Sequence, residues 1–185
     1  MNMQNNVYKK CLLTAIIASG IYAIPSSIAA TQGLLNPTST GSFDVSVTIP
    51  DRVRITGMQD ISFGTYVSGD FDDDYPVCVY SNTPTAQYGV TASGDGASSA
   101  FTITNGTDAI AYRVRWNSVA GTTVGESALT ANVKLDNIPN ANQQSSTCAT
   151  GGNSANLHVQ IQDTAMAGMS NGTYSGTLTI TIEPS

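Results

Sequence analysis

The stretch YSGTLTITI, residues 174–182, decides the fold that the sequence predicts. Apolar residues occupy alternate positions, apart from Gly176, and serine or threonine stands between them. Because successive side chains of a strand point to opposite faces of a sheet, this alternation predicts a strand with one buried and one exposed face. The apolar face consists of Tyr174, Leu178, Ile180 and Ile182, and the polar face of Ser175, Thr177, Thr179 and Thr181.

Short runs of the same kind recur along the chain, separated by polar and glycine-containing stretches. A hairpin is expected at Asn105-Gly106, a dipeptide strongly favoured in tight turns between strands. Residues 68–76 are expected to form a polar turn, and residues 163–170 a helical turn or a loop. No other mature segment indicates a helix, so the pattern predicts an all-β antiparallel sandwich. The expected strands are 43–49, 53–55, 61–67, 77–80, 86–92, 101–104, 110–116, 129–135, 157–161 and 174–182.

Residues 1–30 have the pattern of a signal peptide. Lys9 and Lys10 precede an apolar stretch at 11–24, and Pro25 is followed by small residues, so cleavage is expected after Ala29 or Ala30. A flexible leader, 31–41, and a single sandwich domain, 42–185, then follow. No later stretch reaches the roughly 18 apolar residues of a membrane span, so the mature chain is not expected to insert into a membrane. An uncleaved anchor helix is the alternative reading of residues 1–30.

Export determines how the cysteines are interpreted. Cys11 would leave with the signal peptide, which leaves Cys78 and Cys148 in an oxidising compartment. An even number of cysteines in an exported chain predicts a disulfide, and two cysteines allow only one intrachain pairing. The alternative is two free buried thiols.

The charge of the mature chain argues against several kinds of partner. Once Lys9 and Lys10 are removed, the chain has five Lys and Arg residues and thirteen Asp and Glu residues, which gives a net charge of −8. Such a surface repels phosphate backbones and anionic membranes. Nucleic-acid binding is therefore not expected.

No catalytic or cofactor site is indicated by the sequence. The only histidine, His158, is expected on the polar side of its strand as a surface or rim residue, and no nucleophile motif such as GxSxG accompanies it. One acidic cluster is a weak calcium candidate, although it lacks the glycine and terminal glutamate of an EF-hand loop, and a solvated turn is the preferred interpretation. The cluster is Asp70, Asp72, Asp73 and Asp74. The chain is therefore not expected to be an enzyme or to carry a cofactor.

A second alternating stretch, FDVSVTI at residues 43–49, lies just after the leader. Together with the signal peptide, the two cysteines of the β body and the terminal GTYSGTLTITI, it resembles a pilin subunit of the chaperone–usher pathway. The likeness is greatest to the archaic and alternate branches, which include spore coat protein U-like domains. It is strongest over residues 42–56 and 172–183.

The resemblance implies an Ig-like sandwich that lacks its last strand. The missing strand would be supplied by a neighbouring subunit through donor-strand complementation, a form of β-strand addition. The donor residues would be Phe43, Val45, Val47 and Ile49. The strand that binds first the chaperone and then the donor would present Tyr174, Leu178, Ile180 and Ile182.

The same resemblance implies function, partners and location. The chain would be a structural fimbrial subunit that serves surface adhesion or biofilm formation. Its partners would be a periplasmic chaperone, an outer-membrane usher and other pilus subunits. It would pass through the periplasm and end in a fimbrium at the cell surface.

Two other classes of function stay open at this point. In a self-contained secreted Ig-like binding module, strand 43–49 would fold back into its own sheet. A secreted carbohydrate-active or other enzyme is a further alternative, for which the sequence offers no paired catalytic groups.

Overall fold

The computed structural model describes residues 30–185, so the predicted signal peptide lies almost wholly outside the described residues. The chain divides into two compact units, the first ending at Thr48 and the second spanning Ile49–Ser185. In the first unit the leader bends back on itself, because Thr31 and Ser42 exchange backbone hydrogen bonds of 2.9 and 3.0 Å. Residues 43–48 follow with no strand assignment.

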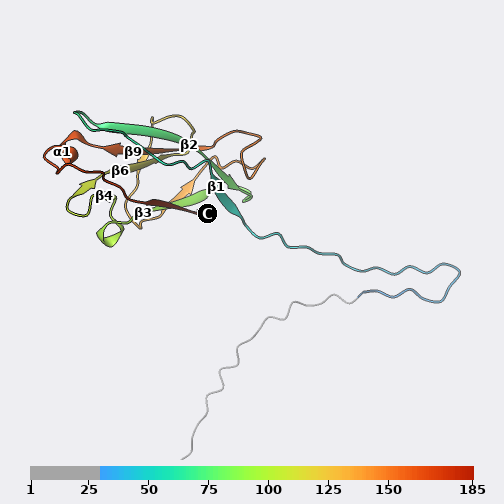
Figure 1. Ribbon diagram of the computed structural model, residues 1–185. Coiled ribbons are helices and arrows are strands. Elements are labelled where there is room, and N and C mark those ends of the chain that lie inside the picture. Colours follow the sequence, from blue (N-terminus) through green and yellow to red (C-terminus); the bar gives the residue numbers. More distant parts are fainter. Residues whose placement is uncertain (1–29) are drawn as a thin grey trace, which may run out of the picture. The chain divides into compact units, whose positions relative to one another are not determined.

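The second unit is an antiparallel β structure, and every ladder between its strands is antiparallel. Its larger sheet has the order β1-β2-β9-β6-β7, and its second sheet has the order β10-β3-β8 (Figure 1). A separate hairpin pairs β4 with β5. The strands are β1 (Val53–Thr56), β2 (Phe71–Ser81), β3 (Tyr88–Gly94), β4 (Thr102–Thr104), β5 (Ala109–Ala111), β6 (Arg113–Asn117), β7 (Ser127–Ala128), β8 (Leu135–Ile138), β9 (Ala155–Ile161) and β10 (Leu178–Pro184).

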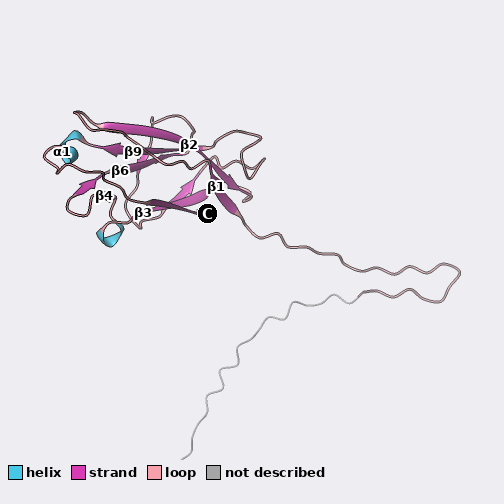
Figure 2. Ribbon diagram, in the orientation of Figure 1, coloured by secondary structure: helices cyan, strands magenta, loops and turns pink. Residues whose placement is uncertain are grey.

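Helical structure in the second unit is confined to two short turns, as Figure 2 shows. They are the 3-10 turn η1 (Ala97–Ser99) and the helix α1 (Asp163–Met166), which lies in the segment where a helical turn or a loop was expected. The all-β antiparallel fold predicted from the alternating pattern is confirmed.

The core lies between the two main sheets and is built from the apolar faces of their strands. Trp116 on β6 is 2% exposed, and its ring meets Tyr88 on β3 edge to face, with ring centroids 6.3 Å apart. The Trp116 indole N–H donates a hydrogen bond of 2.9 Å to the Tyr88 hydroxyl, so neither polar atom is buried without a partner. This pair connects the two sheets across the centre of the core.

The predicted hairpin at Asn105-Gly106 is present, with Ile103 opposite Ile110. The predicted strand 110–116 is interrupted at Tyr112, where the chain passes from the small hairpin to the larger sheet. The Tyr112 backbone N–H donates to the Phe101 carbonyl, and the two rings stack with centroids 5.8 Å apart. The side-chain alternation continues through this change of partner, which is why the sequence shows a single run.

Three of the predicted elements are wrong. Residues 68–76 were expected to be a turn, but Phe71 begins the longest strand, and Phe71, Asp73 and Tyr75 are its half-buried alternate residues. The expected strand 61–67 has no strand assignment, and Gly64 in its middle has a positive φ of 79°. In the region expected to form strand 129–135, the assigned strands instead end at Ala128 and resume at Leu135.

The predicted disulfide is present between Cys78 on β2 and Cys148 in the loop between β8 and β9, with Cα atoms 5.7 Å apart. The loop is also held by Asn142, whose backbone exchanges hydrogen bonds with Val79 and Ser81 on β2. The cross-link therefore fixes a long connection to the central part of the larger sheet.

Candidate functional site

The last strand, β10, lies at the edge of its sheet and pairs only with β3 among the described strands. The ladder runs from Leu178 opposite Gly94 to Pro184 opposite Tyr88. An edge strand presents backbone N–H and C=O groups on its open side, and these can pair with a further strand. The open edge of β10 is thus able to accept a strand.

The inward side chains of β10 are only half-buried. Leu178, Ile180 and Ile182 pack against the core cluster, while Thr179 and Thr181 between them are exposed. A sandwich with closed sides normally buries such a row more completely, because apolar surface gains about 25 cal/mol for each Å² removed from water. The core is therefore incompletely covered along this strand.

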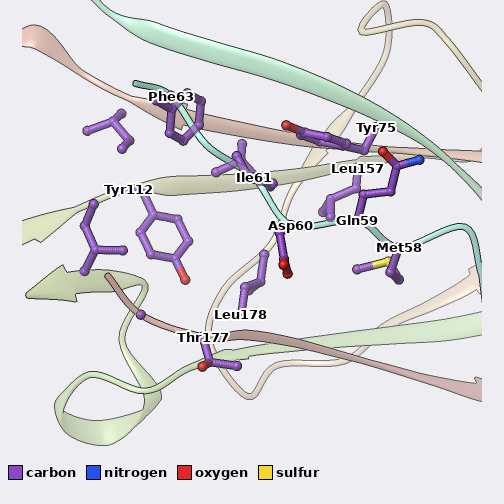
Figure 3. A pocket seen from close by; sticks show the side chains of 14 residues that line it. Met58, Gln59, Asp60, Ile61, Phe63, Tyr75, Tyr112, Leu157, Thr177 and Leu178 are labelled. Atoms are coloured by element: carbon purple, nitrogen blue, oxygen red, sulfur yellow. The ribbon is translucent and has the colours of Figure 1, made fainter. Parts of the chain in front are cut away.

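A cavity of about 350 Å³ opens beside the start of β10. Leu157, Val159 and Ile161 of β9 contribute to its lining, and the segment before β2 and residues 176–178 border it. Figure 3 shows Asp60, Ile61 and Phe63 on the bordering segment, with Tyr112, Thr177 and Leu178 opposite and Leu157 deeper. The lining is mainly apolar, which suits the side chains of a strand rather than a charged ligand.

A second cavity of about 570 Å³ continues toward α1. It shares four lining residues with the first cavity, which are Ile61, Phe63, Ile103 and Ile161. Its far end is formed by Met166 of α1, Met169 and Tyr174. We call the two cavities together the groove. The two cavities adjoin at these four apolar side chains, and polar residues also line the second cavity.

The segment 57–66 forms one border of the groove and is anchored by aromatic and polar contacts. Phe63 stacks on Phe71 of β2 with ring centroids 5.4 Å apart, and the Tyr66 hydroxyl donates a hydrogen bond of 2.6 Å to Asp163. That hydrogen bond, followed by burial and the charge of the Asp163 carboxylate, raises the pKa of Tyr66. The same contact and a backbone hydrogen bond from Gly69 lower the pKa of Asp163. Side chains thus hold this border in place without a backbone ladder.

The start of β10 is fixed by the β4 hairpin and the end of β3. Ser175 exchanges backbone hydrogen bonds with Thr104, and the Thr177 backbone N–H donates a hydrogen bond of 3.0 Å to the Asp95 carboxylate. Gly176 lies so close to this region that a Cβ would stand 2.8 Å from the Thr102 carbonyl oxygen and 2.9 Å from the Asp95 carboxylate. Neither Gly176 nor Asp95 was identified from the sequence. The only sign of Gly176 in the sequence was that it interrupts the apolar alternation of residues 174–182.

The predicted acceptor residues do not share one environment. Leu178 lines the first cavity and Tyr174 the second, whereas Ile180 and Ile182 pack against the core farther along β10. Tyr174 lies before β10 begins, and its hydroxyl donates a hydrogen bond of 2.9 Å to the Ser170 carbonyl. The sequence therefore located the strand, while the groove lies mostly beside its beginning.

The predicted donor residues are exposed. Phe43, Val45, Val47 and Ile49 have 76%, 86%, 86% and 69% of their surface accessible.

The acidic cluster takes separate hydrogen-bond partners. Asp72 contacts His158, Asp73 accepts from Tyr75, and Asp74 accepts from the side-chain amide of Asn156. Asp70 accepts from the backbone N–H of Asp163. Within the described part of the chain, no group of three or more potential ligands could hold a metal ion. The calcium interpretation gains no support from this arrangement.

His158 is on the polar side of β9 as expected, but it is only 8% exposed, so its prediction as a surface residue is wrong. Its Nδ1 lies 2.9 Å from Glu126 and its Nε2 lies 3.1 Å from Asp72, and Glu126 also pairs with Arg115 at 3.1 Å. Burial lowers the pKa of His158, but the hydrogen bonds and charges of Glu126, Asp72 and Asp74 together raise it above the ordinary value. The side chain thus connects β2, β9 and the approach to β7.

No helix in residues 30–185 is both long and apolar enough to cross a membrane. Comparison with protein-family models and with curated proteins gives no match.

Two of the solved structures that match this chain come from chaperone–subunit complexes. A chain of the chaperone–tip adhesin complex of CFA/I fimbriae matches 72% of this chain over 41% of its own length, with 16% identity and a TM-score of 0.53. A chain of the CsuC–CsuE chaperone–tip adhesion subunit pre-assembly complex, from the archaic chaperone–usher Csu pili of Acinetobacter baumannii, matches 79% of this chain over 44% of its own, with 20% identity and a TM-score of 0.44. This chain thus spans less than half the length of either. The first similarity supports the pilin-like fold.

Proposed function

We propose that the chain is a structural fimbrial subunit that polymerises by donor-strand exchange. The segment 43–49 of one subunit fills the groove beside β10 of the next, with Phe43, Val45, Val47 and Ile49 buried as plugs. The subunit is exported, passes through the periplasm and serves adhesion or biofilm formation at the cell surface.

One observation carries this proposal: the second unit has a groove with apolar side chains beside a strand edge, and the chain also has an alternating segment, 43–49, of matching chemistry. Burial of four apolar side chains stabilises by roughly 6–12 kcal/mol. Ordering seven residues costs about 7–14 kcal/mol. Side-chain burial thus offsets most of the cost, and backbone hydrogen bonds to the free edge of β10 supply the remainder.

The open groove also supports the proposed partners. A subunit that exposes part of its core before assembly is prone to aggregation, because an open strand edge can pair with another chain. A periplasmic chaperone that covers the groove until exchange occurs meets this need, and an outer-membrane usher exports the growing polymer. The fold similarity to a chain from a chaperone–tip adhesin complex is consistent with this assignment.

The self-contained module is the alternative, in which strand 43–49 closes the sheet of its own chain and buries one of its faces there. No observation on the described residues favours an enzyme.

The proposal is tested with the mature chain and a synthetic peptide that copies residues 41–49. Alone, the chain should polymerise or melt at low temperature. Excess peptide should raise the melting temperature and suppress polymerisation, because it fills the groove without offering a further groove. A peptide with aspartate at the position of Val47 is the matched control and should do neither. A monomer that is stable without the peptide and unaffected by it would contradict the proposal.

A further inference from the structure

The entry of the chain into β1 is tightly fixed in the second unit. Asn82, just after β2, accepts a hydrogen bond of 2.5 Å from the Arg52 backbone N–H and donates 3.0 Å to the Pro50 carbonyl. The Asn82 backbone N–H also donates 3.1 Å to the Arg52 carbonyl. Residues 50–52 are therefore held against the strands of the second unit, which we call the body, and do not form a loose linker.

This fixed entry limits how far a neighbouring subunit can be. Ile49 is the last proposed donor residue and Val53 is the first residue of β1, so four Cα steps separate them. A fully extended chain covers at most about 3.3–3.6 Å per residue, so this connection reaches no more than about 14 Å. A neighbour that buries Ile49 must then lie close to the end of the body at which β1 begins.

That end carries a hollow that is separate from the groove. Its volume is about 540 Å³, and it lies where the turn after β6 meets the loop between β8 and β9. It shares no lining residue with either cavity of the groove. The side-chain amide of Gln143, one of its lining residues, donates a hydrogen bond of 2.6 Å to the Thr83 carbonyl. Thr83 follows Asn82, the residue that fixes residues 50–52. The hollow therefore adjoins the entry point of the donor segment.

Hydrogen bonds of the buried Asn142 side chain hold the loop between β8 and β9 that lines the hollow. The Asn142 side-chain amide donates to the Thr150 and Gly152 carbonyls at 2.8 and 3.0 Å, and its oxygen accepts from the Gln144 and Ser145 backbone N–H groups. The disulfide of Cys148 closes the same loop. A preformed surface loses little conformational freedom on binding.

The lining of the hollow is uncharged, although the mature chain carries a net charge of −8. Amide residues make up five of its eleven lining residues, which are Asn140, Asn142, Gln143, Gln144 and Asn153. Two copies of an acidic chain repel one another where carboxylates meet, and amides can both donate and accept hydrogen bonds without that repulsion. The chemistry of this surface fits a second acidic protein body.

We infer that this amide-lined hollow is the contact surface between the bodies of successive subunits, occupied by a second copy of the chain. The inference rests on the proposed function, because the short connection from Ile49 to Val53 brings the second copy to this end. Donor-strand insertion supplies most of the affinity, and the hollow fixes the angle between neighbouring bodies.

Photo-cross-linking tests this inference on polymers of the mature chain. Gln144 is replaced by p-benzoylphenylalanine, and Arg113, on the outer face of β6, is replaced in the same way as a control. On irradiation, the residue at position 144 should link two bodies in most polymers, and the residue at position 113 should give at least about fivefold fewer such links. The position-144 variant combined with Val47→Asp should stay monomeric and give no links.

A flexible Gly-Ser insertion between Ile49 and Pro50 provides the second arm. It leaves both the donor segment and the Asn82 contacts in place, so polymers should still form, while the yield of links from position 144 should fall several-fold. Polymers that form normally but give no body-to-body links from position 144 would overturn this inference alone. Failure of the unlabelled chain to polymerise would overturn the proposed function and this inference with it. Binding of a neutral glycan at position 144 in intact polymers, in place of links, would also overturn it.

Discussion

At the residue scale, the shape of the groove depends on Gly176, the one position at which the apolar alternation of residues 174–182 is interrupted. Gly176 allows the chain to pass close to the Thr102 carbonyl and the Asp95 carboxylate just before β10. This approach lets Asp95 cap the Thr177 N–H and places Leu178 at the edge of the first cavity. A residue with no side chain thus sets the position of the strand edge.

Gly176→Val should destabilise the body and narrow the groove. The added Cβ would stand within 3.0 Å of a backbone oxygen, so the chain must shift, at a cost of about 1–3 kcal/mol. Urea unfolding measures the loss, and the affinity for the peptide copying residues 41–49 should fall in parallel. Thr179→Val, on the exposed face of β10, is the matched control and should change neither quantity appreciably.

His158 gives a prediction for pH. Its pKa is raised in the folded chain, so its contribution to stability is fully present below the unfolded pKa of about 6.5 and is lost as the pH rises through the folded value. The free energy of unfolding should therefore decline from pH 6 toward pH 8 relative to that of the His158→Gln variant. Parallel urea titrations across this range measure the difference. An identical pH dependence in the two proteins would show that the contacts of His158 with Glu126 and Asp72 do not control its titration.

At the element scale, local patterns predict strands well and their partners poorly. The Asn105-Gly106 hairpin was predictable because its turn and its strands lie within ten residues of one another. The first half of β2 was not, because the carboxylates of Asp72 and Asp74 are accommodated by His158 and Asn156 of a strand more than 80 residues away. The alternation of β10 predicted its inward face, but its position at a sheet edge follows from long-range pairing that no local pattern encodes.

The donor element makes a separate prediction. Val47→Asp should abolish assembly and leave the folded body intact, because the proposed exchange buries Val47 in the groove of a neighbouring subunit. An unpaired carboxylate buried in an apolar groove costs several kcal/mol, so polymer yield should fall by more than about tenfold. The free energy of unfolding of the monomer should change by less than about 0.5 kcal/mol. Size-exclusion chromatography and urea unfolding of the same samples measure both effects.

At the scale of the whole molecule, the core is closed by a long-range cross-link and left open along one side. The disulfide joins residues 70 positions apart and holds the loop between β8 and β9, while the groove leaves β10 incompletely covered. The predicted pairing of Cys78 and Cys148 required only a count of cysteines and the inference of export. The groove required the complete arrangement of the sheets.

Removal of the disulfide should weaken the body without closing the groove. Cys78→Ala combined with Cys148→Ala should lower the free energy of unfolding by on the order of 4 kcal/mol, because the unfolded chain is no longer constrained across this loop. Thermal unfolding with and without the peptide copying residues 41–49 measures the effect. The peptide should still stabilise the variant, since the disulfide lies outside the groove. Loss of peptide binding would show that the cross-link also shapes the groove.

The most direct measurement of the central claim is an isotope-mixing cross-link from the donor segment. Val45 is replaced by p-benzoylphenylalanine, subunits labelled with heavy and light nitrogen are mixed before assembly, and the cross-linked peptides are identified by mass spectrometry. Donor-strand exchange predicts mixed heavy–light links from position 45 to residues 58–63 or 174–178 of another molecule. Links to those residues that always pair identical isotopes would show that the segment fills the groove of its own chain, and would contradict exchange between subunits.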